Sequence, residues 1–316
     1  MRYYQIVISG STSATYTSYL NGATDTSALQ IELDIPVIGL ATPMGFASIR
    51  IWGVSLKTIS QARDFNGASI SVYGGMQKGL PFANAKQGGL LVQGTILQSF
   101  GNWVGTNQTL DLIIQADGGA TLAEPKNIVL DWAQGVPLDR VITQTLKVAY
   151  PTYTSTVNIN PGLVLSEHAT GVYKTVEDFA NYINQISKSV ITTAGYPGVS
   201  IVLNGTNFNV FDNQTSSTAT DPIQLAFTDL IGQPTWIDSP SIQFNTVMRA
   251  DLSVGSFVKF PIGLVTTTAA SQSQFRDQSA FQGVFQISLV RHVGSYRQPS
   301  ADAWVTTFNA YPASPT

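Results

Sequence analysis

The feature of this chain that most constrains its fold is a turn-rich stretch at 227–235 that leads into an apolar run. Gly232 and Pro234 interrupt any regular element there, because glycine permits a tight turn and proline has no backbone N–H to donate. Soon afterwards a second turn at Gly255 leads directly into the largely apolar residues 257–260. This order predicts a buried strand that starts from a turn and enters a β-sheet core.

The chain has 316 residues, more than a usual single domain, so two or three domains are expected. Only 11% of its residues are charged, against about 25% in ordinary soluble domains. A surface with so little charge suits wide contact with other proteins. The formal net charge is −3, and no cluster of Lys and Arg is present to bind a phosphate backbone. Nucleic-acid binding is therefore disfavoured as a primary role.

Cysteine is absent, which excludes disulfides, thiolate metal sites and a nucleophilic thiol. Residues 1–10 alternate like a strand and lack the apolar core of a signal peptide. No apolar run approaches the roughly 20 residues that span a bilayer. We expect a chain made in a cytoplasm, soluble until it assembles, with no membrane insertion.

Residues 1–119 are expected to form one β-domain. Six segments are rich in Ile, Val, Leu and aromatic residues and are separated by Gly or Asn clusters, namely 3–9, 30–35, 47–54, 69–74, 90–99 and 108–116. Only 56–63 is expected to be helical. Regular strand spacing with one helix favours a closed or nearly closed antiparallel barrel, because closure removes unpaired edges.

A shift to small residues at 117–120 predicts a boundary, and residues 120–220 are expected to form an α+β middle domain. Apolar residues recur on one helical face over 138–150, with Pro137 at its start, and over 176–191. Thr175 and Asp178 match a capping box for the second helix.

We expect both helices to pack on one small sheet made of 127–132, 201–203 and 207–211. Asn204 and Gly205 predict a type I′ hairpin turn between the last two strands, with positive φ at both residues.

Residues 221–316 are expected to form a second barrel. Its predicted strands are 223–227, 241–248, 256–264, 281–292 and 302–310. The strand after Gly283 is expected to run to a glycine turn at Gly294, and 304–310 is expected to pair back on it. The predicted fold is thus mainly β, with two antiparallel barrels and an α+β insert.

No catalytic, cofactor-binding or metal-binding residue is assigned from the sequence. His168 follows Ser166 and Glu167, but neighbouring side chains point apart, so a loop position before the Thr175 cap is expected. His292 is expected to be a structural or interface residue. A zinc site usually needs three or four Cys, His or acidic ligands, so two isolated histidines do not predict zinc binding here.

Paired carboxylates could serve glycoside chemistry, but the candidates lie at strand ends or helix starts, where they act as caps and dipole partners. These are Asp131, Asp139, Glu177 and Asp178. Five tryptophans could stack on sugars, but they are spread over all sections, so packing and interface roles are expected. They are Trp52, Trp103, Trp132, Trp236 and Trp304.

Three segments resemble, in the same order, the baseplate hub proteins of contractile-tailed bacteriophages. The first segment is 130–146. The second consists of 231–234 and 252–260, with the pattern IGQP…LxVGxxVxF. The third is 283–308, with the pattern GxFxIxxVxHxG…WxTxF. The resemblance implies two tail-tube-like barrels around a middle domain, and a trimeric ring in the virion baseplate that joins a sixfold tail tube to a trimeric central spike and lets DNA pass.

The implied partners are further copies of the chain, the tail tube protein, the central spike protein, wedge or sheath-initiator proteins and the tape measure protein. No enzymatic activity is implied. Two alternatives remain open at this point: a glycan-binding or glycan-degrading tail protein, and a tail-tube subunit.

Overall fold

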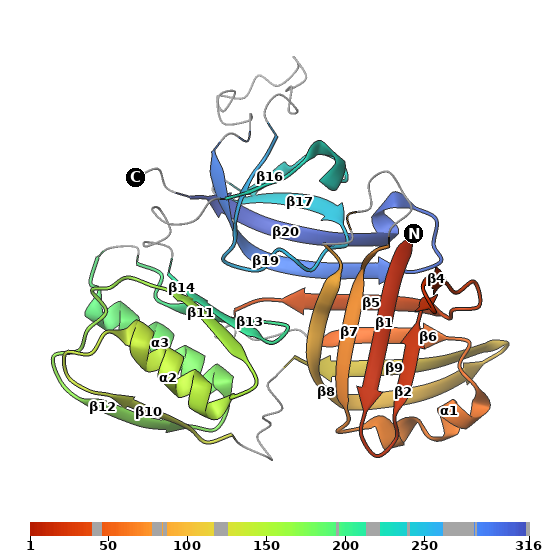
Figure 1. The fold of residues 1–316 in the computed structure, drawn as a ribbon, viewed down its shortest axis with the longest axis horizontal. Helices are drawn as coiled ribbons and strands as arrows, with labels where there is room; N and C mark the ends of the chain where they lie inside the picture. Colours follow the sequence, from red (N-terminus) through yellow and green to blue (C-terminus); the bar gives the residue numbers. More distant parts are fainter. Residues whose placement is uncertain are drawn as a thin grey trace.

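The computed structural model describes residues 1–39, 46–77, 84, 87–116, 126–193, 196–212, 222–238, 241–261, 281 and 283–313. The protein is mainly β, with a large sheet and a smaller α+β part beside it (Figure 1). The domain boundaries predicted at 119/120 and 220/221 lie outside the described residues, and the three-domain division stays a prediction.

All six strands predicted in the first section are present, together with the short helix α1 (Leu56–Ser60), which a 3-10 turn follows at Ala62–Phe65. The strands are β1 (Arg2–Ser9), β5 (Gln30–Val37), β6 (Ala47–Trp52), β7 (Ser69–Met76), β8 (Gly89–Val104) and β9 (Asn107–Gln115). The sequence did not predict β2 (Ala14–Thr17), β3 (Tyr19–Leu20) or β4 (Ala23–Thr24).

The alternation of residues along the strands shows which face of the sheet in this section is buried. In β5 the residues Ile31, Leu33, Ile35 and Val37 are buried, whereas the alternate positions lie on the opposite, partly exposed face. One face of the sheet therefore covers a core and the other carries polar side chains.

The third section supplies β15 (Ile223–Gln224), β16 (Thr235–Asp238), β17 (Ser241–Val247), β18 (Phe257–Lys259), β19 (Val284–Ser295) and β20 (Trp304–Pro312). The predicted entry from a turn into a buried strand is confirmed: Gly255 has φ +88°, and Val258 in β18 is fully buried. The prediction that β20 pairs back on β19 is also confirmed. The predicted turn at Gly294 is wrong, because Gly294 lies inside β19, opposite Trp304, whose ring leaves no room for a Cβ.

The two outer sections share one 13-stranded sheet, which the sequence did not predict. Its order is β16-β17-β20-β19-β5-β6-β9-β8-β7-β1-β2, with β18 paired to β19 and β15 paired to β18. The join is the antiparallel pair β19–β5, from Val290 opposite Val37 to Ser295 opposite Glu32. A single hydrophobic core lies under both sections. Closure of the strands into two barrels stays a prediction.

Both middle helices are confirmed as α2 (Leu138–Ala149) and α3 (Val176–Val190). Thr175 caps α3, because its hydroxyl accepts the N–H of Asp178 at 3.2 Å. None of the helices in the described ranges is both long and apolar enough to cross a membrane.

The single small sheet predicted for this section is wrong. The strand β10 (Ile128–Trp132) pairs with β12 (Ala169–Tyr173), while β13 (Ser200–Asn204), β14 (Asn207–Phe211) and β11 (Thr154–Asn158) form a separate sheet. The two helices lie between these sheets (Figure 1) and share one core with them. The turn between β13 and β14 is also not type I′: its central residues are Gly205 and Thr206, and Gly205 has φ +59° while Thr206 has no positive φ. That pattern fits a type II′ turn.

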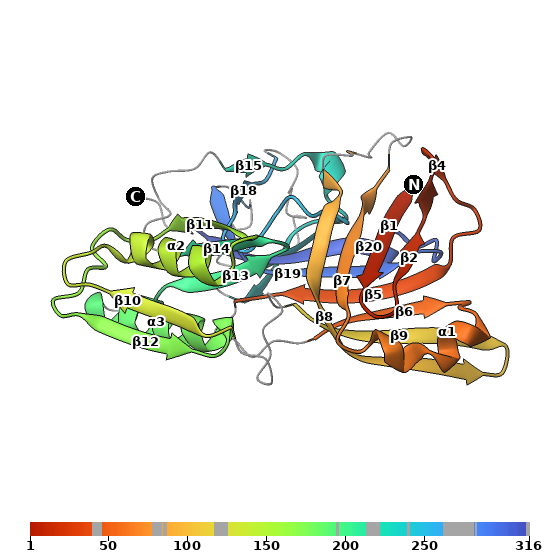
Figure 2. The same cartoon turned by 60° about the horizontal axis from the view of Figure 1, so that its bottom comes forward.

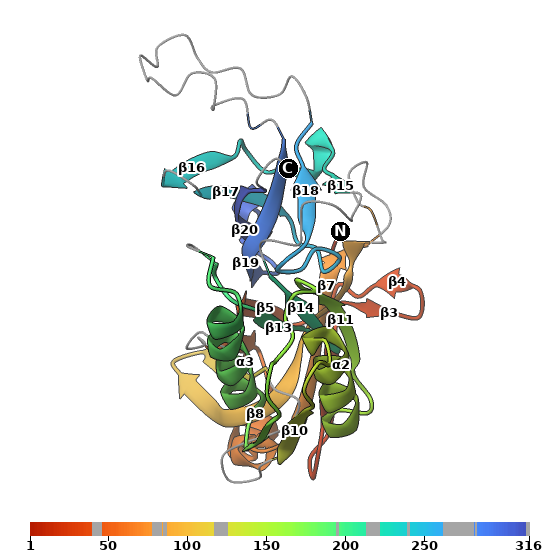
Figure 3. The same cartoon turned by 90° about the vertical axis from the view of Figure 1, so that its left-hand side faces the viewer.

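The β13–β14 hairpin is buried on both faces and fixes the middle section to the large sheet. Ile201 and Leu203 belong to the middle core, whereas Val202 packs in the core of the large sheet. Phe211 also belongs to the large core, and the turn at Gly255 lies against its ring. Figure 3 shows β13 and β14 between the helices and the third-section strands.

Two arginines tie the β19–β20 loop to the first section. The Arg2 guanidinium in β1 donates to the carbonyls of Ser295 (2.8 Å), Tyr296 (3.1 Å) and Ser300 (2.6 Å) and to that of Gln298. In return, Arg297 from the loop donates to the carbonyls of Thr26 and Ala28 in the first section. We call the hydrogen bonds of Arg2 and those of Arg297 the arginine clips. They reinforce the β19–β5 join.

We expect Arg2→Met to lower the free energy of unfolding by about 2 kcal/mol, because charge-assisted hydrogen bonds to several carbonyls are lost together. Urea unfolding followed by tryptophan fluorescence measures this. The control is Arg140→Met on the exposed side of α2, which should stay within about 0.5 kcal/mol of the parent. Equal midpoints for the two variants would refute a structural role for the clip.

Candidate functional site: the polar face of the shared sheet

The β19–β5 join places the outward side chains of both outer sections on one polar face. The face extends over β17, β20, β19, β5, β6, β9 and β8, which are consecutive in the sheet. Figure 2 shows the strands from β19 to β9 lying side by side. The strand alternation decides which side chains lie on it.

An arginine–carboxylate pair bridges the join itself. Arg291 on β19 donates from Nε and Nη2 to the two carboxylate oxygens of Asp34 on β5, at 2.7 and 2.5 Å. This hydrogen bonding, the largest cause, and the nearby charge raise the pKa of Arg291 against its partial desolvation. Both side chains are about half exposed, so the pair contributes at most about 1 kcal/mol to stability. Its main effect is to neutralise both charges.

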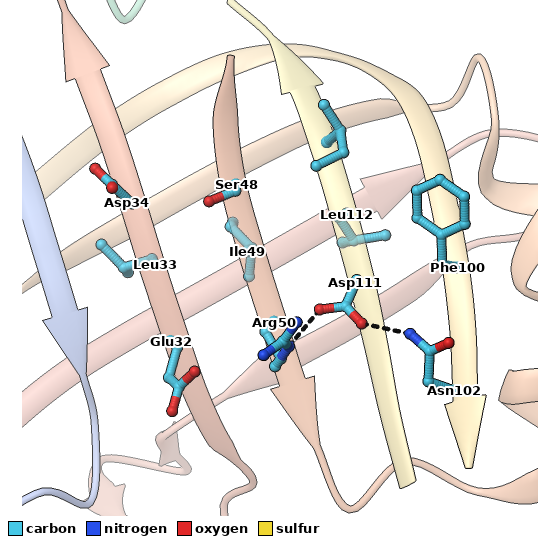
Figure 4. A pocket seen from close by; sticks show the side chains of 11 residues that line it. Glu32, Leu33, Asp34, Ser48, Ile49, Arg50, Phe100, Asn102, Asp111 and Leu112 are labelled. Atoms are coloured by element: carbon cyan, nitrogen blue, oxygen red, sulfur yellow. Dashed lines mark hydrogen bonds and ion pairs between the residues drawn. The ribbon is translucent and has the colours of Figure 1, made fainter. Parts of the chain in front are cut away.

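A second charge cluster lies on the next three strands of the sheet, β6, β9 and β8, in a concave part of the face of about 550 Å³ (Figure 4). Asp111 on β9 accepts from Arg50 on β6 and from Asn102 Nδ2 on β8 at 2.7 Å. The Arg50 guanidinium also lies 5.7 Å from the centre of the Trp52 ring. Arg50 therefore has both an ionic and a cation–π partner.

Beyond Arg291, the third-section strands β17 and β20 carry amides and hydroxyls on this face. Gln243 Nε2 on β17 donates to Asn309 Oδ1 on β20 at 3.2 Å, and Thr307 lies on the same face of β20. With Glu32 included, the charged residues that line the concave region and the join are Arg50, Arg291, Glu32, Asp34 and Asp111. The face therefore carries one excess negative charge and no lysine among these residues.

A buried ionic cluster supports the sheet near β17. Arg249 is 3% exposed and donates to both carboxylate oxygens of Asp251 at 2.7 Å. Its Nη1 lies 3.6 Å from Asp229, which accepts from the side chain of Gln87 at 2.9 Å. Asp229 lies in the turn-rich stretch 227–235, and Arg249 and Asp251 lie between it and the turn at Gly255. Their pairing was not predicted. The sequence signal that could have predicted this cluster is the presence of two carboxylates near one arginine in a sparsely charged chain.

Neither histidine stands in a catalytic arrangement. His168 Nε2 lies 2.5 Å from Asp131 Oδ1 on the exposed face of β10–β12. The expectation that Asp131 serves as a cap is therefore wrong, because it lies within β10 and pairs with His168. His292 is 2% exposed in β19 and its Nδ1 hydrogen bonds to Thr306 at 2.9 Å. In the described residues no three His, Asp or Glu side chains gather closely enough to hold a metal ion.

The other residues weighed for glycan chemistry are dispersed. Asp139 lies in the first turn of α2, and Glu177 and Asp178 lie in that of α3, as expected for dipole partners. Trp132 and Trp304 are buried. Trp236 stacks on Phe281 at 5.6 Å, and Trp103 is exposed at the end of the β8–β9 hairpin.

No protein-family model and no curated protein sequence matches this chain. Solved structures do match it. The prophage MuSo2 43 kDa tail protein of Shewanella oneidensis superposes with a TM-score of 0.53 over 98% of each chain, at 9% identity. The two proteins share a fold. The resemblance to tail proteins inferred from sequence is thereby confirmed at the level of the fold.

Two further matches are weaker in superposition. A tail protein of Neisseria meningitidis MC58 matches over 98% of this chain and 96% of its own, with TM-score 0.48 and 11% identity. The Escherichia coli c3393 protein matches over 90% of this chain and 73% of its own, with TM-score 0.49 and 10% identity. It is described as a type VI secretion component with structural similarity to the T4 bacteriophage tail proteins gp27 and gp5.

The burial of His292 predicts a pH-dependent stability. Desolvation lowers its pKa to about 4, against about 6.5 in an unfolded chain. The unfolded state therefore binds the proton more readily between these values. The contribution of neutral His292 is fully present above pH 6.5 and is lost as the pH falls towards 4, by up to about 3 kcal/mol.

Urea unfolding at pH 7.5 and pH 4.5 measures this effect, and the variant His292→Asn separates it from the titration of carboxylates. We expect the parent to lose more stability than His292→Asn between the two pH values. Equal losses would show that His292 does not titrate with folding.

Proposed function

We propose that this chain is a structural hub of a contractile phage tail baseplate or of a related injection device. The observation that carries the proposal is the shared fold with a prophage tail protein over 98% of both chains. The sparsely charged composition supports it, because such a surface suits extensive protein contacts. In this proposal the function lies in matched surfaces, and the chain is not an enzyme.

The proposed assembly is a trimeric ring. Each chain would supply two related β-sections, so that three chains present six similar units to a sixfold tail tube and threefold symmetry to a central spike. The other proposed partners are wedge or sheath-initiator proteins and the tape measure protein, all in the virion baseplate.

The polar face of the shared sheet is the proposed wall of the axial channel. Passing DNA must not be held, and a basic wall would bind it by releasing counterions. On this face Asp34 and Asp111 neutralise the two arginines, and the neighbouring strands carry amides and hydroxyls. DNA would therefore meet a nearly neutral surface.

Glycan hydrolysis is the weaker candidate. It requires one carboxylic acid that stays protonated beside a second carboxylate. In the concave region Asp111 already contacts Arg50, and Asp34 contacts Arg291 at the join. Each of these carboxylates is therefore engaged in an ion pair with an arginine of a neighbouring strand.

Mass photometry of the purified chain, alone and with its tube and spike proteins, tests the ring. We expect a species of three copies of the 33.9 kDa chain. A protein that stays monomeric in every mixture would contradict the hub proposal.

Adding positive charge to the polar face should slow DNA passage without preventing assembly. The variants are Ile113→Lys on β9 and Thr307→Lys on β20, combined in one chain, with Ile113→Gln and Thr307→Gln as the neutral control. DNA ejection from particles carrying each chain is the measurement, and the lysine effect should weaken as salt is raised. Equal ejection rates at low salt would exclude this face as the channel wall.

A further inference from the structure

The third section repeats the strand order of the first section. Five strands of the first section lie in the sheet in the order β5-β6-β9-β8-β7. The third section has the order β16-β17-β20-β19, and β18 pairs with β19 as β7 pairs with β8. In each section these are five consecutive strands of the chain, and all neighbouring pairs are antiparallel. The two sections are therefore two copies of one strand arrangement.

The repeat extends to the register of the strands. The pairing of β8 with β9 is irregular between Ile96 and Gln98, and that of β19 with β20 is irregular between Ile287 and Leu289. Next to this irregularity, corresponding residues form one row across four strands in each section. The row is Asp34, Ser48, Ile113 and Gln98 in the first section, and Thr235, Gln243, Asn309 and Leu289 in the third. β5 therefore corresponds to β16, and β8 corresponds to β19.

The β19–β5 join uses one edge of each section and leaves the corresponding edges open. The counterparts of the two joined strands are β8 and β16. β16 ends the sheet, and β7 covers β8 only from Gly89 to Thr95. Among the described strands, none pairs with the outer edge of β16 or with that of residues 98–104 of β8. Unpaired strand edges of this kind are templates for pairing with another chain.

Apolar side chains at the open edges are less covered than those at the join. Ile35 on β5 is fully buried beside β19, whereas its counterpart on β16, Trp236, is only partly buried. The next residue, Ile237, is 49% exposed, and Phe100 on β8 is 48% exposed. Figure 4 shows Phe100 on the outermost strand of its row. A neighbouring strand at each edge would cover these side chains.

We infer that β8 of one copy pairs with β16 of the next copy, antiparallel and in the register of the β19–β5 join. The occupant is a second copy because the join already pairs the counterparts of these two edges within one chain. At the join Val293 lies opposite Asp34. The counterpart of Val293 is Asn102, so Asn102 is expected opposite Thr235 of the next copy. This contact rests on the proposed ring and adds to it the strands and the register that join neighbouring subunits.

The two edges are unlike, so the contact is head-to-tail and forms a ring when the rotation between copies closes. The rotation that relates the first section to the third would then be repeated between copies. The polar face would continue from β8 of one copy onto β16 and β17 of the next, where Thr235 is paired with Gln243. The wall of the proposed channel would thus have no gap between subunits.

The junction between copies differs from the join in its charge. At the join Arg291 donates to Asp34. The counterparts of these two residues are Phe100 and Thr235, which carry no charge. The contact between copies therefore depends on backbone hydrogen bonds and apolar contacts, as in other strand additions. Moderate salt should have little effect on it.

Because the chain has no cysteine, a disulfide between copies reports the register. The test variant carries Asn102→Cys and Thr235→Cys, and the control carries Val104→Cys and Thr235→Cys. Directly opposite Cβ atoms lie about 5 Å apart, near the distance that a disulfide requires, whereas diagonal neighbours lie about 7 Å apart. Val104 is 73% exposed, so access does not limit the control. Under mild oxidation of the assembled ring, we expect the test pair to form linked trimers about tenfold faster than the control.

A transplanted ion pair supplies an independent measurement. Phe100→Arg with Thr235→Asp would rebuild between copies the pair that Arg291 and Asp34 form within the chain. Each single variant should weaken self-association in mass photometry, with circular dichroism unchanged. Combined, they should associate about fivefold more tightly than the product of the single effects predicts, and raised salt should reduce this gain. The neutral combination Phe100→Gln with Thr235→Asn should show no such gain.

The outcomes separate the strand contact from the ring. An assembled ring in which the test pair links no faster than the control, or in which the rebuilt ion pair gives no gain, overturns the contact and leaves the hub proposal standing. Efficient linking by Asn102→Cys alone would show a two-fold contact between β8 edges and also overturns the inference. A chain that never associates, with or without its tube and spike proteins, overturns both proposals.

Discussion

The pairing of β19 with β5 is the interaction on which the rest of the molecule depends. It joins strands about 257 positions apart in the chain and makes one sheet out of the first and third sections. The two outer sections share the hydrophobic core beneath this sheet, so each section completes the core of the other. The Arg291–Asp34 pair and the two arginine clips lie at this join. The exposed ion pair contributes little stability by itself. Together with the arginine clips it fixes the register in which the polar face becomes continuous.

The middle section depends on a different constraint, the β13–β14 hairpin that is buried on both faces. A strand covered on one side by helices and on the other by a sheet must be apolar at successive positions, as Ile201, Val202 and Leu203 are. The same hairpin therefore belongs to two cores. This arrangement fixes the middle section against the large sheet.

Regular alternation and helical periodicity predicted the strands β5, β6 and β7 and the helices α2 and α3, because burial on one face leaves a clear pattern. The strands β11, β12 and β2 were missed because they are rich in Thr, Gly and Tyr and are only partly buried. Pairing between distant strands has no local signal, so the shared sheet was not predictable from periodicity. The polar face was missed for the same reason: Arg50, Asp111 and Asn102 come together only through register. The turn-rich region around the buried Arg249 cluster was recognised as constraining the fold, but the pairing of Arg249 with Asp229 and Asp251 was not predicted.

The Arg2 clip has a consequence for how the chain reaches its folded state. The guanidinium on the second residue is held by carbonyls that lie up to 298 positions later in the sequence. During synthesis, β1 and β5 leave the ribosome long before the loop and strand that complete their surroundings. Because contacts between distant segments must wait for closure of a long loop, they form slowly. The open edge of β5 is then a strand edge able to pair wrongly with other chains. Each new copy of the chain must therefore complete its last strands before its exposed edges meet those of other copies.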